Sequence, residues 1–147
     1  MDAGERLRAW WKATGVDVPA SSRAESEIAA LEARYCVTLP DEFRRYLILC
    51  PAGVDFDEHN GAWWSIPTIG NVTEEYPSVS GPQIAAAADK YLVFADFLIW
   101  SWAWAICCDD GPDRGKVAVI GGNPDRIVAN SFGEFVDLYF KESGAVL

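Results

Sequence analysis

The segment IWSWAWAICC, residues 99–108, limits what this chain can fold into more than any other stretch of its sequence. If the segment is one β-strand, its side chains alternate between two faces. One face then carries the small residues Ser101, Ala103, Ala105 and Cys107, and the other carries Trp100, Trp102, Trp104, Ile106 and Cys108. The large face either fills a core or, where uncovered, offers aromatic side chains to a partner. We expect it to fill a core, with Trp100 the most exposed member because it lies nearest the strand start.

The same apolar run is too short to cross a membrane. From Phe97 to Cys108 it is interrupted only by Ser101, whereas a membrane-spanning helix needs about 20 apolar residues. The opening residues, MDAGERLRAWW, lack the apolar run and the cleavage site of a signal peptide. We therefore expect a cytoplasmic protein with no membrane segment.

Charge and composition narrow the class of partner. The chain has 147 residues, of which 22 are acidic and 12 basic, giving a net charge of −10, and half are hydrophobic. This composition predicts one globular domain over residues 1–147. Because no run of Lys and Arg opposes the net charge, we expect no direct contact with nucleic acid. A basic protein would instead be attracted.

Three helices are predicted in the first part of the chain. The first is amphipathic and centres on residues 7–11. Ser22 and Glu25 have the spacing of a capping box for the second helix, which stops near Cys36. The third has Pro40 in its first turn. Its apolar side chains repeat at i, i+3, i+4 and i+7: Phe43, Tyr46, Leu47 and Cys50.

Beyond these helices the pattern changes to short apolar runs between turn-forming residues, which is typical of strands. The expected strands are Trp63 to Ile69, Tyr91 to Phe94, Trp102 to Cys108 and Lys116 to Ile120. The alanine-rich stretch 82–90 predicts one short helix, and DDGPDRG, residues 109–115, predicts a hairpin turn. A final amphipathic helix starts with a Ser131–Glu134 capping box and ends near Gly144.

A longer motif links the second and third helices. The run IAALEARYCVTLPDEFRRYLILCPAG joins a helix with I-x-x-L-E to Leu-Pro, acidic residues, an aromatic helix and a glycine. Its defining positions are Ile28, Leu31, Glu32, Leu39, Pro40, Asp41, Phe43, Tyr46, Leu47 and Gly53. In order, there follow the strand led by Trp63 and Trp64, YLVFAD, a strand ending in Asp109, KVAVI and SFGEFVDLYF. The chain thus resembles the SMI1/KNR4, or SUKH, superfamily over residues 22–140. It departs in having Pro51-Ala52-Gly53 where the family often has Asn-Gly or Gly-Gly.

The resemblance implies a fold and a way of working. The implied fold is a single α+β domain with a central mixed or antiparallel sheet, and helices from the N-terminal region and the C-terminus packed around it. Many bacterial members are immunity proteins that bind and neutralise a cognate toxin, often a nuclease or deaminase, while fungal relatives act in cell-wall and signalling control. The family works by binding, without a shared catalytic motif. A toxin inhibitor is therefore implied first, and a regulatory or scaffold protein with a stable cellular partner is the alternative.

Partner contacts are expected where acidic clusters and tryptophans occur together. The acidic candidates are Asp55, Asp57 and Glu58; Glu74 and Glu75; and Asp109, Asp110 and Asp113. Such groups could fill a cationic groove that binds phosphate. The aromatic candidates are Trp63, Trp64 and Trp100, since tryptophan is common at interface hot spots. Each cluster is equally compatible with a solvated loop, and strand alternation sends at least one of Trp63 and Trp64 into the core.

A catalytic or metal site has weaker support. DFDEH, the Asp55–His59 region, joins the sole histidine to three carboxylates, which suits acid–base work in a hydrolytic enzyme. It lacks an adjacent nucleophile, so it names no reaction. The cysteines Cys36, Cys50, Cys107 and Cys108 form no C-x-x-C pair, and DDGPDRG lacks EF-hand spacing. We therefore expect no catalytic residues, no metal and no cofactor.

Overall fold

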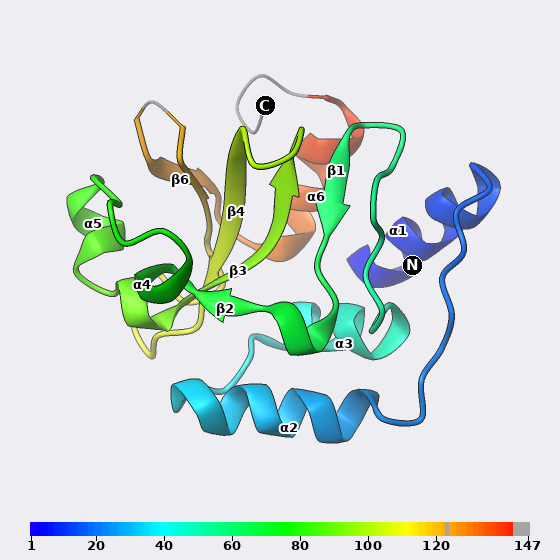
Figure 1. Cartoon of the computed structure of the whole chain (residues 1–147), viewed down its shortest axis with the longest axis horizontal. Helices are drawn as coiled ribbons and strands as arrows, with labels where there is room; N and C mark the ends of the chain where they lie inside the picture. Colours follow the sequence, from blue (N-terminus) through cyan, green and yellow to red (C-terminus); the bar gives the residue numbers. More distant parts are fainter. Residues whose placement is uncertain (123, 143–147) are drawn as a thin grey trace.

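Within residues 1–122 and 124–142, which the computed structural model describes, a six-stranded antiparallel sheet forms the centre of the protein (Figure 1). Its strands are β1 (Gly61–Trp63), β2 (Gly70–Asn71), β3 (Tyr91–Phe97), β4 (Trp102–Cys107), β5 (Val117–Ile120) and β6 (Arg126–Ala129). Their order is β1-β3-β4-β5-β6, and β2 pairs with β3 beside β1. These pairings are antiparallel. The predicted α+β class is confirmed, and of the two sheet types expected the protein has the antiparallel one.

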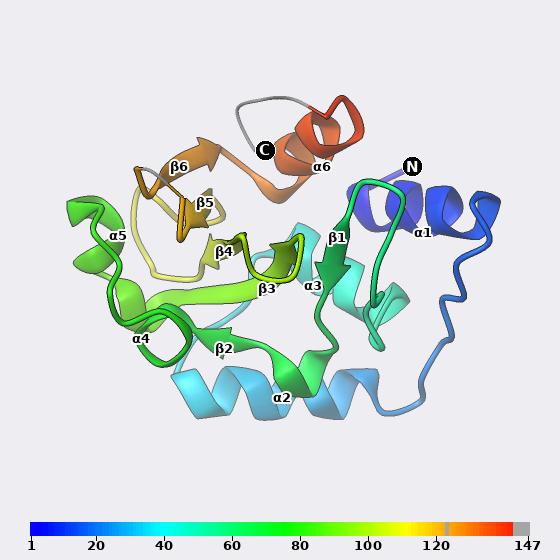
Figure 2. The ribbon, with the colours of Figure 1, turned by 45° about the horizontal axis from the view of Figure 1, so that its top comes forward.

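The longer helices pack into the main core on one side of the sheet. They are α1 (Ala3–Ala13), α2 (Ala24–Tyr35), α3 (Asp41–Leu49) and α6 (Phe132–Phe140). The other face is covered by α4 (Val72–Glu75) and α5 (Pro82–Ala85), which contribute Val72 and Ile84 to a second apolar cluster. Figure 2 shows α4 and α5 on the side of β3 and β4 away from α3 and α6. Both chain ends therefore supply helices that pack around the sheet, as predicted, and these helices lie on the same side of it.

The alternation of β4 decides what each face of the sheet holds. Trp104 and Ile106 enter the main core, whereas Ala103, Ala105 and Cys107 face the second cluster. Small side chains on that second face let the short helices approach closely. The predicted division into a large and a small face is therefore confirmed for the strand itself.

Two predicted elements differ from the structure. The expected strand 63–69 is wrong beyond its first residue: β1 ends at Trp63, β2 begins at Gly70, and a 3-10 helix, η1 (Ile66–Thr68), lies between them. Pro67 in this stretch has no amide to donate to a strand ladder. The expected helix 82–90 forms α5 and a 3-10 helix, η2 (Ala88–Lys90). Ile84 is the buried residue of α5 and η2 has none, so little packing supports a longer helix. Gly144, expected near the end of α6, lies outside the described residues.

The two predicted capping boxes have different outcomes. Ser22 lies in a turn, one residue before the N-cap Arg23, and no side chain caps α2. Ser22 is thus out of register, and the capping box with Glu25 is wrong. At α6 the Ser131 hydroxyl does accept the amide of Glu134 at 3.0 Å.

The residues of the helical motif are structural. Its apolar members are buried in the main core: Ile28, Leu31, Leu39, Phe43, Tyr46 and Leu47. The Glu32 carboxylate accepts the amide of Leu39 at 2.8 Å, which fixes the link between α2 and α3. Pro40 is the N-cap of α3 and lies just before its first turn. Gly53 has a φ of 69°, and a Cβ there would lie 2.1 Å from the Trp63 carbonyl oxygen.

Candidate protein-binding surface

The exposed large apolar side chains of the described residues gather at one end of the sheet. Besides Met1 they are Phe56, Leu98, Ile99 and Trp100, and Ile99 is the most open at 88% exposure. Phe56 lies in the loop before β1, and the other three form the turn between β3 and β4. Apolar side chains exposed together are typical of contact sites for other proteins.

Strand pairing brings these two loops side by side (Figure 1). Gly61 of β1 pairs with Phe97 of β3, and the Leu98 amide donates to the Asn60 carbonyl oxygen at 3.0 Å. The loop before β1 also exposes two carboxylates, so acidic and apolar groups share this end. We refer to it as the loop-end surface: Asp55, Phe56, Glu58, Leu98, Ile99 and Trp100.

A shallow hollow adjoins the loop-end surface through His59. Its volume is about 400 Å³, and it is lined by Met1, Arg6, Trp10, His59 and Phe140. Met1, the remaining exposed large apolar residue, therefore belongs to the same end of the molecule. The end thus combines a projecting turn with a recessed aromatic surface.

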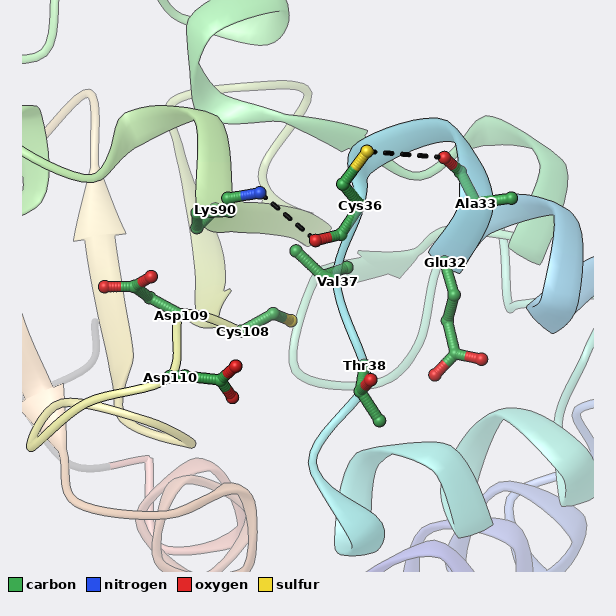
Figure 3. A pocket seen from close by; sticks show the side chains of 9 residues that line it. All are labelled: Glu32, Ala33, Cys36, Val37, Thr38, Lys90, Cys108, Asp109 and Asp110. Carbon is green, nitrogen blue, oxygen red and sulfur yellow. Dashed lines mark hydrogen bonds between the residues drawn. The ribbon is translucent and has the colours of Figure 1, made fainter.

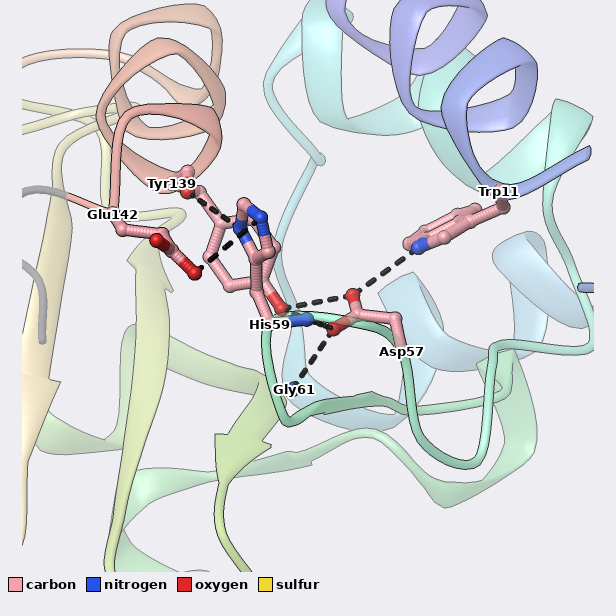
Figure 4. A network of polar contacts seen from close by, with 6 residues as sticks. All are labelled: Trp11, Asp57, His59, Gly61, Tyr139 and Glu142. Atoms are coloured by element: carbon pink, nitrogen blue, oxygen red, sulfur yellow. Dashed lines mark hydrogen bonds and ion pairs between the residues drawn. The ribbon is translucent and has the colours of Figure 1, made fainter. Parts of the chain in front are cut away.

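A buried carboxylate fixes the loop before β1. Asp57 is only 4% exposed. Its oxygens accept hydrogen bonds of 2.7–3.2 Å from three side chains, Trp11, Trp63 and Tyr139, and two backbone amides, His59 and Gly61. Figure 4 shows these partners except Trp63. Burial, and then the charge of Asp57, raise the pKa of the Tyr139 hydroxyl well above its ordinary value. Asp57 therefore joins α1, β1 and α6 to one loop.

Two residues predicted to contact a partner, Asp57 and Trp63, are buried. Asp57 was expected on the surface, but its charge is satisfied internally by five groups. Trp63 is also buried, with its ring against Trp11 and Tyr139. As expected for neighbouring strand positions, Trp64 points elsewhere and is half-buried. Asp57 and Trp63 hold the surface in place from beneath.

The turn between β3 and β4 has an unusual backbone. Leu98, Ile99 and Trp100 have φ angles of 45°, 52° and 64°, so three successive residues other than glycine are left-handed. For L-residues this region costs about 1–2 kcal/mol per residue, and the β-branched Ile99 is among the least suited to it. These residues precede β4, so the expectation that Trp100 continues the strand is wrong.

A second buried aspartate supports this turn. Asp96, 8% exposed, accepts the Trp100 amide at 3.0 Å on Oδ1 and the Trp64 indole N–H at 2.8 Å on Oδ2. The Trp100 ring, 38% exposed, stacks at 25° on Tyr76, with 6.3 Å between ring centroids. Trp100 therefore lies on the small-residue side of the sheet. The predicted anchors Trp64 and Trp100 are neighbours, joined through Asp96.

Other predicted acidic contacts lie away from the loop-end surface. The turn after β4 holds Asp109, Asp110 and Asp113, at the opposite end of that strand. There Asp109 and Asp110 line a cleft of about 440 Å³ against the end of α2 (Figure 3). Glu74 pairs with Arg34 of α2 at 2.8 Å, and Glu75 is exposed on α4.

The carboxylates of this turn are partly neutralised by neighbours. Asp113 receives hydrogen bonds from Gln83 at 2.8 Å and Lys116 at 3.0 Å, and these bonds, Gln83 first, lower the pKa of its carboxyl. Asp110 lies 3.7 Å from Arg114. Of the predicted surface residues, Asp55, Glu58 and Trp100 are exposed at the loop end, and the half-buried Trp64 lies beside Trp100.

The histidine region is arranged for structure. Asp57 accepts the backbone amide of His59, while the ring nitrogens face the Tyr139 carbonyl oxygen at 3.1 Å and the Glu142 carboxylate at 3.5 Å. The ring also packs on Trp10, with 4.7 Å between centroids. Asp57 and the imidazole therefore do not form a carboxylate–imidazole pair.

The described residues contain neither a metal-ligand cluster nor a membrane-spanning helix. Across residues 1–122 and 124–142, no three His, Cys, Asp or Glu side chains are grouped to hold a metal ion. Over the same part of the chain, no helix has the length and apolar character needed to cross a membrane.

Sequence reasoning missed three of the exposed apolar residues, Phe56, Leu98 and Ile99. The available signal was FLIW at 97–100, an apolar run that continues past the end of a strand and into a turn. Turns ordinarily favour Gly, Asn, Asp and Pro, so large apolar residues in one are candidates for binding.

The fold and this surface define a class: an α+β domain that exposes an apolar and acidic surface on two neighbouring loops. A protein-family model described as the SMI1 / KNR4 family (SUKH-1) matches residues 24–138. Because the match covers most of the chain, the protein belongs to the SMI1/KNR4 family, as its sequence motif predicted. No curated protein sequence matches it.

Proposed function

We propose that this protein is a cytoplasmic immunity protein that binds and neutralises a basic toxin domain, of the nuclease or deaminase type, through the loop-end surface. The observation that carries this proposal is the gathering of Phe56, Leu98, Ile99 and Trp100 beside exposed carboxylates at one end of the molecule. Membership of a family that includes immunity proteins supports the same conclusion.

The two kinds of group at the loop end serve different steps of binding. Affinity comes mainly from apolar and aromatic side chains that become buried in the complex. The net charge of −10 and the exposed Asp55 and Glu58 attract a cationic partner and speed association. An acidic inhibitor of this kind occupies the place of phosphate on the toxin without performing chemistry.

Isothermal titration and stopped-flow kinetics against a catalytically inactive toxin domain, encoded beside the gene for this protein, test the proposal. We expect nanomolar binding whose association rate falls as salt is raised, with a smaller change in dissociation rate. No binding to that domain would contradict toxin neutralisation and favour a stable cellular partner. Tight binding that ignores salt would contradict the electrostatic part alone.

A further inference from the structure

We propose that Leu98 and Ile99 form a pre-shaped anchor that enters an apolar pocket of the toxin, bordered by Lys or Arg side chains that meet Asp55 and Glu58. This inference rests on the proposed function and deepens it, because it names the inserted residues and the chemistry of the receiving site. On this proposal, the strained and exposed turn serves binding and not folding.

The backbone of the turn is held in one shape by its surroundings. The Leu98 amide is bound to Asn60, and the Ser101 amide donates to the Phe97 carbonyl oxygen at 2.8 Å. The Ser101 hydroxyl donates to the Leu98 carbonyl oxygen at 2.9 Å. With the bond from Trp100 to Asp96, these contacts maintain a left-handed conformation that the residues themselves disfavour.

Unlike Trp100, whose ring stacks on Tyr76, the Ile99 side chain contributes little to the protein's own packing. Ile99 is 88% exposed and Leu98 is also exposed. A glycine or asparagine would adopt the same backbone angles with less strain. The chain therefore accepts both an unfavourable backbone and exposed apolar surface at one place, a combination expected when the side chains act on a partner.

The flanking charges define the partner's chemistry. Asp55 and Glu58 are exposed on the loop that contacts the turn through Asn60. A pocket edged by cations pairs with them, whereas an anionic membrane surface would be repelled by a chain of net charge −10. The favoured occupant of this site is therefore a basic protein with an apolar pocket.

The decisive variant is Ile99→Gly, measured in the full chain. Glycine tolerates the left-handed backbone, so we expect the urea midpoint to rise or stay the same. The affinity for the inactive toxin domain should nevertheless fall at least tenfold, mainly through faster dissociation. A purely structural role for Ile99 would not produce this opposition between stability and affinity.

Two further variants keep the test specific. Ile99→Asn also suits a left-handed backbone and should weaken binding to a similar degree, whereas Thr38→Asn, exposed at the opposite end of the sheet, should bind as the wild type does. If the wild type binds the toxin domain and both Ile99 variants bind equally well, the anchor is overturned and toxin neutralisation stands. If the wild type does not bind, both proposals fail.

Vesicles distinguish a protein partner from a lipid one. The probe is sedimentation with phosphatidylcholine vesicles, with and without phosphatidylserine. We expect the wild type to remain in the supernatant with both. Sedimentation of the wild type that is lost in Ile99→Gly would overturn the protein pocket and assign the turn to a lipid surface.

Discussion

The turns at the two ends of β4 differ in backbone conformation. One joins β3 to β4, and the other joins β4 to β5. In the turn after β4, the residue with positive φ is Gly115, at 83°. In the turn before β4, positive φ falls on Leu98, Ile99 and Trp100. The first turn is conformationally relaxed and the second is strained and held by neighbours. Strain together with exposure therefore distinguishes the loop end and supports the proposal that it binds a partner.

The ends also differ in how they use carboxylates. Near the turn after β4, Asp110 and Asp113 pair with cations from the same turn, Arg114 and Lys116. At the loop end, Asp57 and Asp96 are buried beneath the surface and accept hydrogen bonds from neutral groups. Both ends are therefore rich in acidic residues, but these residues have different roles. Those of the turn after β4 are surface charges, whereas Asp57 and Asp96 are buried and stabilise the loops above them.

Removing the buried carboxylate of Asp57 should have the largest effect on stability. Asp57→Ala leaves three side-chain donors and two amides without their acceptor, and we expect a loss of roughly 3–5 kcal/mol in the free energy of unfolding. Urea denaturation followed by circular dichroism measures it. The matched change at the other end, Asp113→Ala, should leave the urea midpoint nearly unchanged. Equal losses would remove the distinction between the two ends.

Tyr139→Phe removes one side-chain donor to Asp57 and should therefore have a smaller effect than Asp57→Ala. It removes the hydroxyl hydrogen bonds to Asp57, and we expect a loss of about 1.5–3 kcal/mol at neutral pH. Tyr46→Phe is the control, because the buried Tyr46 hydroxyl has no hydrogen-bond partner among the described residues, so its loss should cost little. A Tyr46→Phe variant that is as unstable as Tyr139→Phe would contradict the role of the Asp57 bond.

The raised pKa of Tyr139 also predicts an alkaline dependence. The folded protein keeps this phenol protonated, whereas the unfolded chain loses the proton above about pH 10. The folded state then binds more protons, so stability falls as pH rises above that value. Tyr139→Phe should flatten the fall, as measured by urea midpoints at a series of pH values between neutral and strongly alkaline. An unchanged slope would show that other groups control it.

Neutralising acidic residues at the loop end should slow association with the toxin more than neutralising those in the turn after β4. We expect Asp55→Asn with Glu58→Gln to slow association with the toxin domain by about fivefold at physiological salt. Asp109→Asn with Asp110→Asn removes the same charge beyond the six residues of β4, roughly 20 Å away at ~3.4 Å per residue. At physiological salt this distance exceeds the screening length of about 8 Å, so the second pair should have little effect. The reverse ranking would move the interface to the turn after β4.

A thiol label on Cys36, at the end of the molecule opposite the loop-end surface, should have the smallest effect on toxin binding. Cys36 is the exposed cysteine, while Cys50, Cys107 and Cys108 are buried, and burial raises the pKa of the Cys50 thiol to about 12. We therefore expect one thiol to react with a maleimide in the folded protein and four in urea, counted by mass spectrometry. Labelling at Cys36 fills part of the cleft beside Asp109 and Asp110 but should leave toxin binding unchanged.

Much of the fold could be predicted because it depends on local patterns. The apolar repeat of α3 and the alternation of β4 each show which face is buried, whatever the rest of the chain does. The two residues of β2 carry too little pattern to detect. β6 was also missed, since its side chains are only partly buried and lack a strong apolar alternation.

The loop-end surface was predicted only in part for a similar reason. Acidic and aromatic residues are visible in the sequence, but their exposure is not. Asp55 and Asp57 are two positions apart, yet one is exposed and the other is enclosed by groups from α1, β1 and α6. Trp100 was placed on the wrong face because three left-handed residues, a conformation with no sequence signal here, precede the strand.

The α+β class, the family, the net charge and the two faces of β4 can be inferred from the amino-acid sequence alone, because they follow from composition, motifs and regular periods along the chain. Tertiary structure decided which carboxylates are buried and which two loops meet. Those outcomes depend on contacts between residues far apart in the chain, such as Asp57 with Tyr139 and Asn60 with Leu98. Local periodicity carries no information about such contacts, so the loop-end surface emerges only when the chain is folded.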